Sequence, residues 1–307
     1  MNTDRRPPEA LVSEDVRLPY SKGLMAKTLM GTGIRPERAY ELARLIEGEL
    51  VRGHEDETVG AERLYDVAAS VLAEHEGEEA VRLLRRLQAL RELDLPIVLL
   101  IGGATGTGKS TVATEIAHRL GVTRVTSTDT VRQTMRAFFS QKFMPSIHYS
   151  SFEAGPAVRI HESEEADAAL LGFKEQTRNV LVGVKAVIAR ALEERYSLAV
   201  EGVHLVPGAL PRSYDGAVVV QCLLSIADED AHARHFWIRD AGSEGVRPMD
   251  KYLRALPEIR QIQEYLVERA EKAGVPVIEN SRMEVAVNGV IHLVLAEVER
   301  AQAQAKL

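Results

Sequence analysis

The sequence predicts an α/β protein in which a five-stranded parallel sheet is covered by helices on both faces and is preceded by a small helical domain. Three observations predict this fold. Five apolar runs with strand character occur after residue 96, longer segments with helical spacing separate them, and the first run leads into a glycine-rich loop. The predicted strands are residues 97–101, 123–127, 198–202, 217–226 and 275–279.

Residues 1–93 form the predicted helical domain. Apolar residues repeat at helical spacing within residues 39–50, 64–72 and 80–87, so each segment would bury one side. Charged links that contain glycine separate the three segments, and Pro96 marks the end of the region. Residues 94–307 are predicted to form the second domain, around the parallel sheet.

The most specific motif is Gly103–Ser110, which fits the phosphate-loop pattern G-x-x-x-x-G-K-[ST] without a mismatch. Its glycines allow tight turns in which backbone N–H groups point at a polyphosphate. Lys109 is expected to reach the β- and γ-phosphates of ATP, and Ser110 to offer its hydroxyl to Mg²⁺. The predicted nucleotide-binding residues are Gly103, Ala104, Thr105, Gly106, Thr107, Gly108, Lys109, Ser110 and Thr111.

Acidic residues follow the second and third predicted strands, at the carboxyl ends where parallel sheets bind ligands. Asp129 is expected to orient or deprotonate an acceptor hydroxyl; alternatively, it caps the next helix. Glu201 resembles the acid that holds Mg²⁺ or its water in phosphate-loop enzymes; alternatively, it pairs with an arginine. Lys109 and Asp129 are therefore candidate catalytic residues, and Ser110 and Glu201 are candidate metal ligands.

Two cationic segments are predicted to complete the site. The poorly periodic stretch at about 130–172 is read as an acceptor-site insertion, and the stretch at about 228–256 as a lid that brings Arg239 and Arg247 to the transferring phosphoryl group. Taken singly, each cationic residue of these segments could instead be a solvated surface group or a packing group.

The composition excludes several classes of protein. A net charge of −7 over 307 residues argues against a general nucleic-acid binder. Cys222 is the only cysteine and lies in an apolar run, so we expect a buried thiol and neither intrachain disulfides nor cysteine-based zinc sites. Residues 1–9 lack the apolar core of a signal peptide, and no membrane-spanning run is present. A cytoplasmic protein with no membrane partner is expected.

Several segments of the chain form a distinctive set. Residues 201–208, Glu-Gly-Val-His-Leu-Val-Pro-Gly, are the most distinctive, because many unrelated NTPases share the phosphate loop. The other segments are 101–110, 127–132, 150–152, 277–280, 19–24 and the Arg247-Pro248 pair. Together they resemble the 2-phosphoglycerate kinase family of phosphate-loop kinases, and the resemblance covers nearly the whole chain.

This resemblance implies a kinase that transfers the γ-phosphoryl group of ATP to the 3-hydroxyl of 2-phosphoglycerate, giving 2,3-bisphosphoglycerate, with Mg²⁺ as cofactor. It also implies an N-terminal region similar to the ATP-cone domain at Val16–Leu87, which here lacks the usual Lys-Arg-Asp-Gly opening. A phosphorylated acid calls for several convergent cationic groups. The residues available to bind it are Arg132, Arg136, His148, Arg159 and His204.

Three other interpretations stay open at this point. The chain could be a phosphate-loop kinase for another small hydroxylated metabolite, or a non-catalytic ATP sensor in which the helical domain relays nucleotide occupancy to a partner. A polynucleotide kinase is disfavoured, because the chain is acidic and has no evident aromatic and basic track for a strand. The oligomeric state is left open.

Overall fold

The computed structural model describes residues 18–53, 58–91, 93, 95–158, 168–241 and 249–305. Its contacts divide the chain into two compact units, Met1–Asp94 and Leu95–Leu307. This division falls one residue beyond the boundary expected from the helical stripes and Pro96. Within the described ranges, no helix combines the length and the apolar character needed to cross a lipid bilayer.

Four helices account for most of the described part of the N-terminal unit. The three predicted stripes lie in α2, α3 and α4, whereas α1 was not predicted, because it is short and its buried residues form no long stripe. Ser21 caps α1 by accepting a hydrogen bond from the Leu24 N–H. The elements are β1 (Leu18–Pro19), α1 (Lys22–Met30), α2 (Pro36–Gly53), β2 (Thr58–Val59), α3 (Ala61–His75) and α4 (Glu78–Arg91), with β1 and β2 antiparallel.

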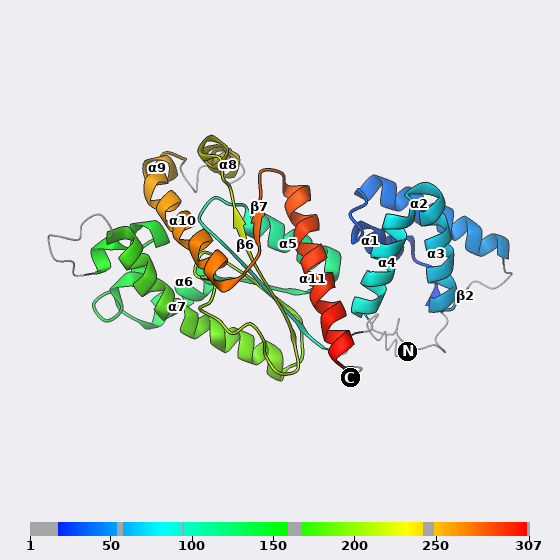
Figure 1. The fold of residues 1–307 in the computed structure, drawn as a ribbon, viewed down its shortest axis with the longest axis horizontal. Coiled ribbons are helices and arrows are strands. Elements are labelled where there is room, and N and C mark those ends of the chain that lie inside the picture. Colours follow the sequence, from blue (N-terminus) through cyan, green and yellow to red (C-terminus); the bar gives the residue numbers. More distant parts are fainter. Residues whose placement is uncertain are drawn as a thin grey trace, which may run out of the picture. The chain divides into compact units, whose positions relative to one another are not determined.

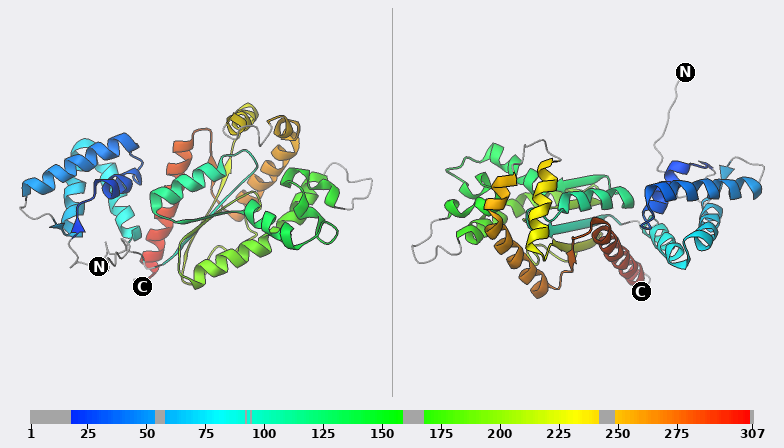
Figure 2. Two further views of the ribbon diagram at one scale, coloured as in Figure 1. Left: turned by 180° about the vertical axis from the view of Figure 1, so that it is seen from behind. Right: turned by 90° about the horizontal axis from the view of Figure 1, so that it is seen from above.

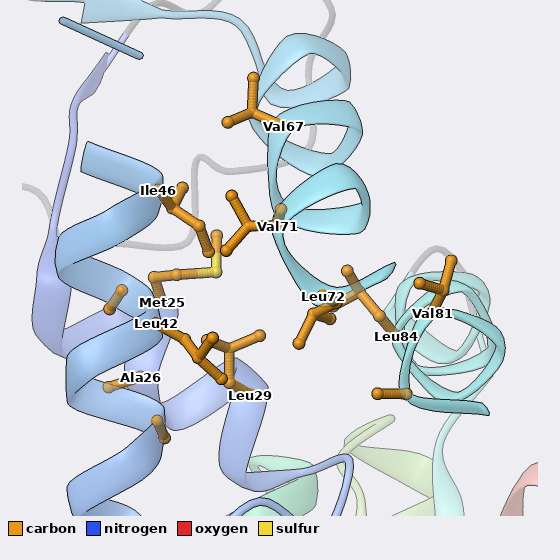
Figure 3. Close-up of a cluster of buried hydrophobic side chains, with 14 of the residues drawn as sticks. Met25, Ala26, Leu29, Leu42, Ile46, Val67, Val71, Leu72, Val81 and Leu84 are labelled. Carbon is orange, nitrogen blue, oxygen red and sulfur yellow. The ribbon is translucent and has the colours of Figure 1, made fainter. Parts of the chain in front are cut away.

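The apolar faces of these helices meet in one core (Figure 3). Leu29 of α1, Leu42 and Ile46 of α2 and Leu72 of α3 are fully buried in it, and Leu84 of α4 joins them. Removal of these side chains from water is the main stabilising contribution in a unit of this size.

The C-terminal unit is built on a five-stranded sheet in the order β4-β5-β3-β6-β7, and every pairing is parallel. This confirms the predicted fold class. The central strand β3 is buried along its whole length, and burial raises the pKa of the Cys222 thiol on β6 to about 12. The strands are β3 (Ile97–Gly103), β4 (Arg124–Ser127), β5 (Leu198–Glu201), β6 (Val218–Ser225) and β7 (Val277–Glu279).

Helices cover both faces of this sheet, with α5 and α11 on one side and α6, α7 and α10 on the other (Figures 1 and 2). Val98 and Leu100 of β3 pack with Val180 and Val184 of α7. Because side chains alternate along a strand, the buried Leu99 and the residues two positions before and after it point to the opposite face, toward α5 and α11. The helices are α5 (Lys109–Leu120), α6 (Thr128–Phe138), α7 (Ala168–Glu193), α10 (Leu256–Ala273) and α11 (Met283–Ala305).

The predicted insertion and lid contain more regular structure than expected. Helix α7 begins at Ala168, within the stretch that was read as the insertion; its first six residues, Ala-Ala-Leu-Leu-Gly-Phe, are apolar without a break and give no amphipathic signal. Short 3₁₀ turns pack against α7, and two helices lie between β6 and α10. These elements are η1 (Pro145–His148), η2 (Ser151–Glu153), η3 (Gly155–Ala157), α8 (Glu229–Ala241) and α9 (Met249–Arg254).

Candidate active site

The carboxyl ends of three neighbouring strands bring the predicted site residues to one edge of the sheet. Ile101 of β3 is in register with Glu201 of β5, and Glu201 is in register with Ser127 of β4. The phosphate loop starts two residues after Ile101, and Asp129 lies two residues after Ser127. Three loops that are distant in sequence therefore begin side by side at this edge of the sheet.

The phosphate loop leads directly into α5, whose first residue is Lys109. The helix is preceded by Gly108, a residue with no side chain to cap the first N–H groups, which leaves them available for an anion. The Lys109 Nζ donates a 2.6 Å hydrogen bond to the Ala104 carbonyl, and the Thr107 hydroxyl donates to the same oxygen at 2.9 Å. The amine is thereby folded over the loop that is predicted to hold phosphates.

Ser110 and Glu201 meet beside this loop. The Ser110 hydroxyl donates a 3.0 Å hydrogen bond to Oε1 of Glu201, a carboxylate that is only 6% exposed. Mg²⁺ prefers hard oxygen ligands and usually takes one or two from protein and the rest from phosphates and water. The pair fits such an ion, and the partner of Glu201 within the described residues is this serine, in place of the arginine considered as the alternative.

Asp129 lies in the first turn of α6 with its carboxylate 64% exposed. The alternative that it caps the helix is wrong, because Ser127 is the N-cap and accepts a 3.0 Å hydrogen bond from the Thr130 N–H. Partial burial tends to raise the pKa of Asp129, but interactions with His204, Arg132 and Lys109, including the hydrogen bond from Arg132, outweigh it and lower the pKa overall. Asp129 is therefore a charged, solvent-facing acceptor at neutral pH.

Arg132 was expected to bind substrate, but its guanidinium is used within the protein. It is 7% exposed, donates from Nη1 to the carbonyls of Ile147 and Tyr149 at 2.9 Å, and donates from Nε to Asp129 at 3.2 Å. This placement makes Arg132 a positioning residue that ties Asp129 to the η1 segment.

His204 was also expected to bind substrate, and the structure places it in the core with 0% exposure. Its Nε2 lies 2.8 Å from the Gln176 side-chain oxygen and its Nδ1 lies 2.8 Å from the Thr128 hydroxyl. Both ring nitrogens are thus occupied, which corrects the expected role: the ring as placed cannot also contact a ligand.

This network fixes the protonation of His204. The Gln176 amide nitrogen donates to the carbonyls of Ser146 and Tyr149, so its oxygen must accept from the Nε2–H of His204. The Nδ1 then accepts from the Thr128 hydroxyl. Burial lowers the pKa of His204 to about 4, which keeps the ring neutral at pH 7.

The remaining predicted acceptor residues are less enclosed. Arg136 is exposed and donates to the Gln133 side-chain oxygen at 3.1 Å, whereas His148 is half-buried and donates from Nε2 to the Phe139 carbonyl at 2.9 Å. Arg159 lies outside the described residues. Of these three, Arg136 is the one whose charge is seen to face solvent.

The predicted lid is described in part. Arg247 lies outside the described residues, as does the side chain of Arg239, whose backbone belongs to α8. In α9, Lys251 forms a 2.8 Å ion pair with Glu153 of η2. This pair links the predicted lid to the predicted insertion.

Sequence reasoning missed two groups of residues at this site. Gln176 is fully buried on the apolar face of α7, and a polar side chain within that stripe was the available signal. His232, His235 and Asn280 contact the phosphate loop itself, and their spacing along the chain gave no sign of it.

Curated relatives match nearly the full chain, although no family model does. The chain is 34% identical over 291 residues to 2-phosphoglycerate kinase of Methanopyrus kandleri, covering 93% of this chain and 86% of that protein. It is 36% identical to 2-phosphoglycerate kinase of Methanothermobacter thermautotrophicus, covering 89% of each chain, and 35% identical to that of Pyrococcus furiosus, covering 90% and 89%.

Solved structures of small-molecule kinases also align with the chain. A gluconokinase from Sinorhizobium meliloti is 14% identical with a TM-score of 0.36, covering 69% of this chain and 97% of its own. A shikimate kinase from Bacteroides thetaiotaomicron is 19% identical with a TM-score of 0.30, covering 69% and 99%.

Proposed function

Because the chain belongs to the 2-phosphoglycerate kinase family, and so is an ATP-dependent small-molecule kinase, we propose that it phosphorylates the 3-hydroxyl of 2-phosphoglycerate to give 2,3-bisphosphoglycerate. The observation that carries this proposal is the meeting of the phosphate loop, the Ser110–Glu201 pair and the exposed Asp129 at one edge of the sheet. A kinase needs these three parts together, whereas an ATP sensor needs only the first.

The phosphate loop and the start of α5 bind the nucleotide. Loop N–H groups surround the phosphates, and Lys109 leaves the Ala104 carbonyl to reach the β- and γ-phosphates. Ser110 and Glu201 would hold Mg²⁺, which would supply positive charge against the negative charge that develops during transfer. The lid residues Arg239 and Arg247 are proposed to add positive charge at the transferring group.

Asp129 orients the acceptor hydroxyl toward the γ-phosphorus. Its lowered pKa makes it a weak base, so it acts mainly by accepting a hydrogen bond from the hydroxyl and takes up the proton late in the transfer. Arg132 holds the carboxylate through the 3.2 Å hydrogen bond from Nε. Such positioning is the main contribution that a protein makes to phosphoryl transfer.

The acceptor carries a phosphate and a carboxylate, and both require cationic partners. Arg136 is the proposed contact that faces solvent, and Arg159 and His148 are proposed to complete the pocket. Arg132 and His204 support this pocket without contacting the acceptor. Arg132 holds the backbone of η1, and His204 holds the side-chain amide of Gln176.

Product identification tests the proposal. The enzyme is incubated with ATP, Mg²⁺ and either 2-phosphoglycerate or 3-phosphoglycerate, and the products are followed by ³¹P NMR. We expect 2,3-bisphosphoglycerate and stoichiometric ADP from the 2-isomer. Absence of a bisphosphorylated product from that isomer, or equal turnover of an unphosphorylated hydroxy acid, would overturn the assignment.

Substitution of Asp129 by asparagine tests its role in the same assay. The amide cannot accept the proton, so kcat should fall by about 100-fold or more while the affinity for ATP is retained. The matched control is Asp215→Asn, a change at an exposed aspartate before β6, which should leave kcat unchanged. Near-normal turnover of the Asp129 variant would contradict the proposed role.

A further inference from the structure

Three successive carbonyl groups of the phosphate loop are held by side chains from outside the loop. His232 of α8 donates from Nε2 to the Thr105 oxygen at 2.8 Å, and His235 of the same helix donates from Nδ1 to the Gly106 oxygen at 3.2 Å. Asn280, the residue after β7, donates from Nδ2 to the Thr107 oxygen at 2.8 Å. Each ring nitrogen must be the donor, because a carbonyl oxygen only accepts.

A held carbonyl also fixes an N–H group. In a trans peptide the C=O and the N–H of the same unit point in opposite directions, and the peptides of this loop are trans. When the carbonyls of Thr105, Gly106 and Thr107 are drawn toward α8 and Asn280, the N–H groups of the three following residues are turned the other way. Those residues are Gly106, Thr107 and Gly108, the centre of the phosphate-binding motif. The Thr107 N–H also donates a 3.4 Å hydrogen bond to the Ala104 carbonyl within the loop, so a phosphate that binds here must compete with that carbonyl for it.

The loop is pressed closely against the side chains that hold it. A Cβ on Gly106 would lie 2.5 Å from the Phe236 ring and 3.0 Å from Nε2 of His232, and a Cβ on Gly108 would lie 2.5 Å from Nδ2 of Asn280. Both glycines also have positive φ, +89° and +79°. The motif therefore needs glycine at these positions for contact with α8 and Asn280 as well as for its turns.

His232 itself is firmly placed. It is 0% exposed, stacks on Phe236 at 5.4 Å, and Phe236 stacks in turn on Tyr252 of α9 at 5.2 Å. Burial lowers the pKa of His232 to about 4; the hydrogen bond to Thr105 opposes this shift, whereas electrostatic interactions with Arg260, His235 and Lys109 add to it. The ring is therefore a neutral donor whose Nε2–H is committed to the Thr105 carbonyl.

We propose that His232, His235 and Asn280 are positioning residues for nucleotide binding, which set the peptide planes of the phosphate loop so that its N–H groups face the phosphates of ATP. The proposal rests on ATP binding by this loop and is independent of which acceptor is used. The three residues act through the loop backbone.

Measurements of nucleotide affinity in two variants separate the contribution of the His232 hydrogen bond from the contribution of its ring packing. His232→Phe keeps a ring that can stack on Phe236 but has no N–H, whereas His232→Gln keeps a donor at a similar reach and loses the ring. The affinity for Mg-ADP and Mg-ATP is measured by calorimetry without acceptor, so failure of the proposed acceptor would not affect the result. The control is His292→Phe, at an exposed position of α11.

We expect His232→Phe to weaken nucleotide binding by about tenfold and His232→Gln by less than about threefold. His235→Phe, at a half-buried position that tolerates the change more readily, should weaken binding in the same direction if the first variant does not fold. Equal losses in His232→Phe and His232→Gln would overturn the proposal, since ring packing would then be the cause. Wild-type affinity in both phenylalanine variants would also overturn it.

Discussion

Substitution of His204 by glutamine should reduce the loss of stability that the C-terminal unit undergoes in mild acid. The ring is fully buried and neutral, and its pKa is lowered from 6.5 to about 4. Below pH 6.5 the unfolded chain therefore binds a proton at this position that the folded chain does not bind. The free energy of unfolding falls as the pH falls, until the folded state is also protonated near pH 4.

The magnitude follows from the size of the shift. One pKa unit corresponds to about 1.4 kcal/mol, so this one residue removes about 3 kcal/mol between pH 6.5 and pH 4. His232, whose pKa is also lowered to about 4, contributes a similar loss in the wild type and in the His204 variant. The difference between the two proteins therefore isolates His204.

Glutamine keeps a donor for the Gln176 oxygen but gives up the acceptor for the Thr128 hydroxyl. That loss should cost about 1–3 kcal/mol at pH 7. Because the variant has no group that titrates at this position, its stability should then fall less steeply, and the two curves should converge near pH 4.

The free energy of unfolding is measured by urea unfolding at a series of pH values, with the fluorescence of Trp237 as the signal. That residue is the only tryptophan and belongs to α8, so it reports on the C-terminal unit alone. His118→Gln, at an exposed position of α5, is the matched control and should keep the wild-type slope. Parallel loss of stability in the wild type and His204→Gln between pH 6.5 and pH 4 would refute the reasoning.

Two further changes test the metal ligand and the packing of the helices. Glu201→Gln should lower kcat by about 100-fold and raise the Mg²⁺ concentration needed for half-maximal rate, because a neutral amide binds Mg²⁺ poorly; an unchanged Mg²⁺ requirement would argue against the Ser110–Glu201 pair as ligands. Arg119→Met should lower the free energy of unfolding by about 1–3 kcal/mol, since the buried guanidinium ties α5 to Glu284 of α11. Thermal melts measure this, with Arg178→Met, a change at an exposed arginine of α7, as the control. Equal melting temperatures of the two variants would contradict the prediction.

The features that the sequence predicted correctly depend on short-range patterns. The apolar runs gave the strands within a few residues. The physical reason is clearest for β3 and β5, because a strand buried on both faces must be apolar nearly throughout. The placement of Lys109, Ser110, Asp129 and Glu201 at one edge of the sheet also followed from their positions in the motif or after strands, whereas their roles stay predictions.

The features that the sequence did not predict depend on partners distant in the chain. Arg132 was expected to contact the substrate because of its charge, but its guanidinium donates to the carbonyls of Ile147 and Tyr149. Nothing in the spacing shows that η1 folds back over α6. The contacts of His232 with a loop 127 residues earlier are of the same kind.

Burial nevertheless decides what a histidine can do, and part of that information is local. His204 is flanked by Val203, Leu205 and Val206, all of which are buried in the structure. A histidine in such a run is expected to be neutral, because burial disfavours the charged form. It is therefore a poor candidate for an anion-binding group. A neutral imidazole offers one donor and one acceptor in a fixed plane, and it therefore suits a bridge between a hydroxyl and an amide oxygen. Arg136 is the opposite case, since its exposed position on α6 leaves its charge in solvent, where it is proposed to meet an acceptor phosphate.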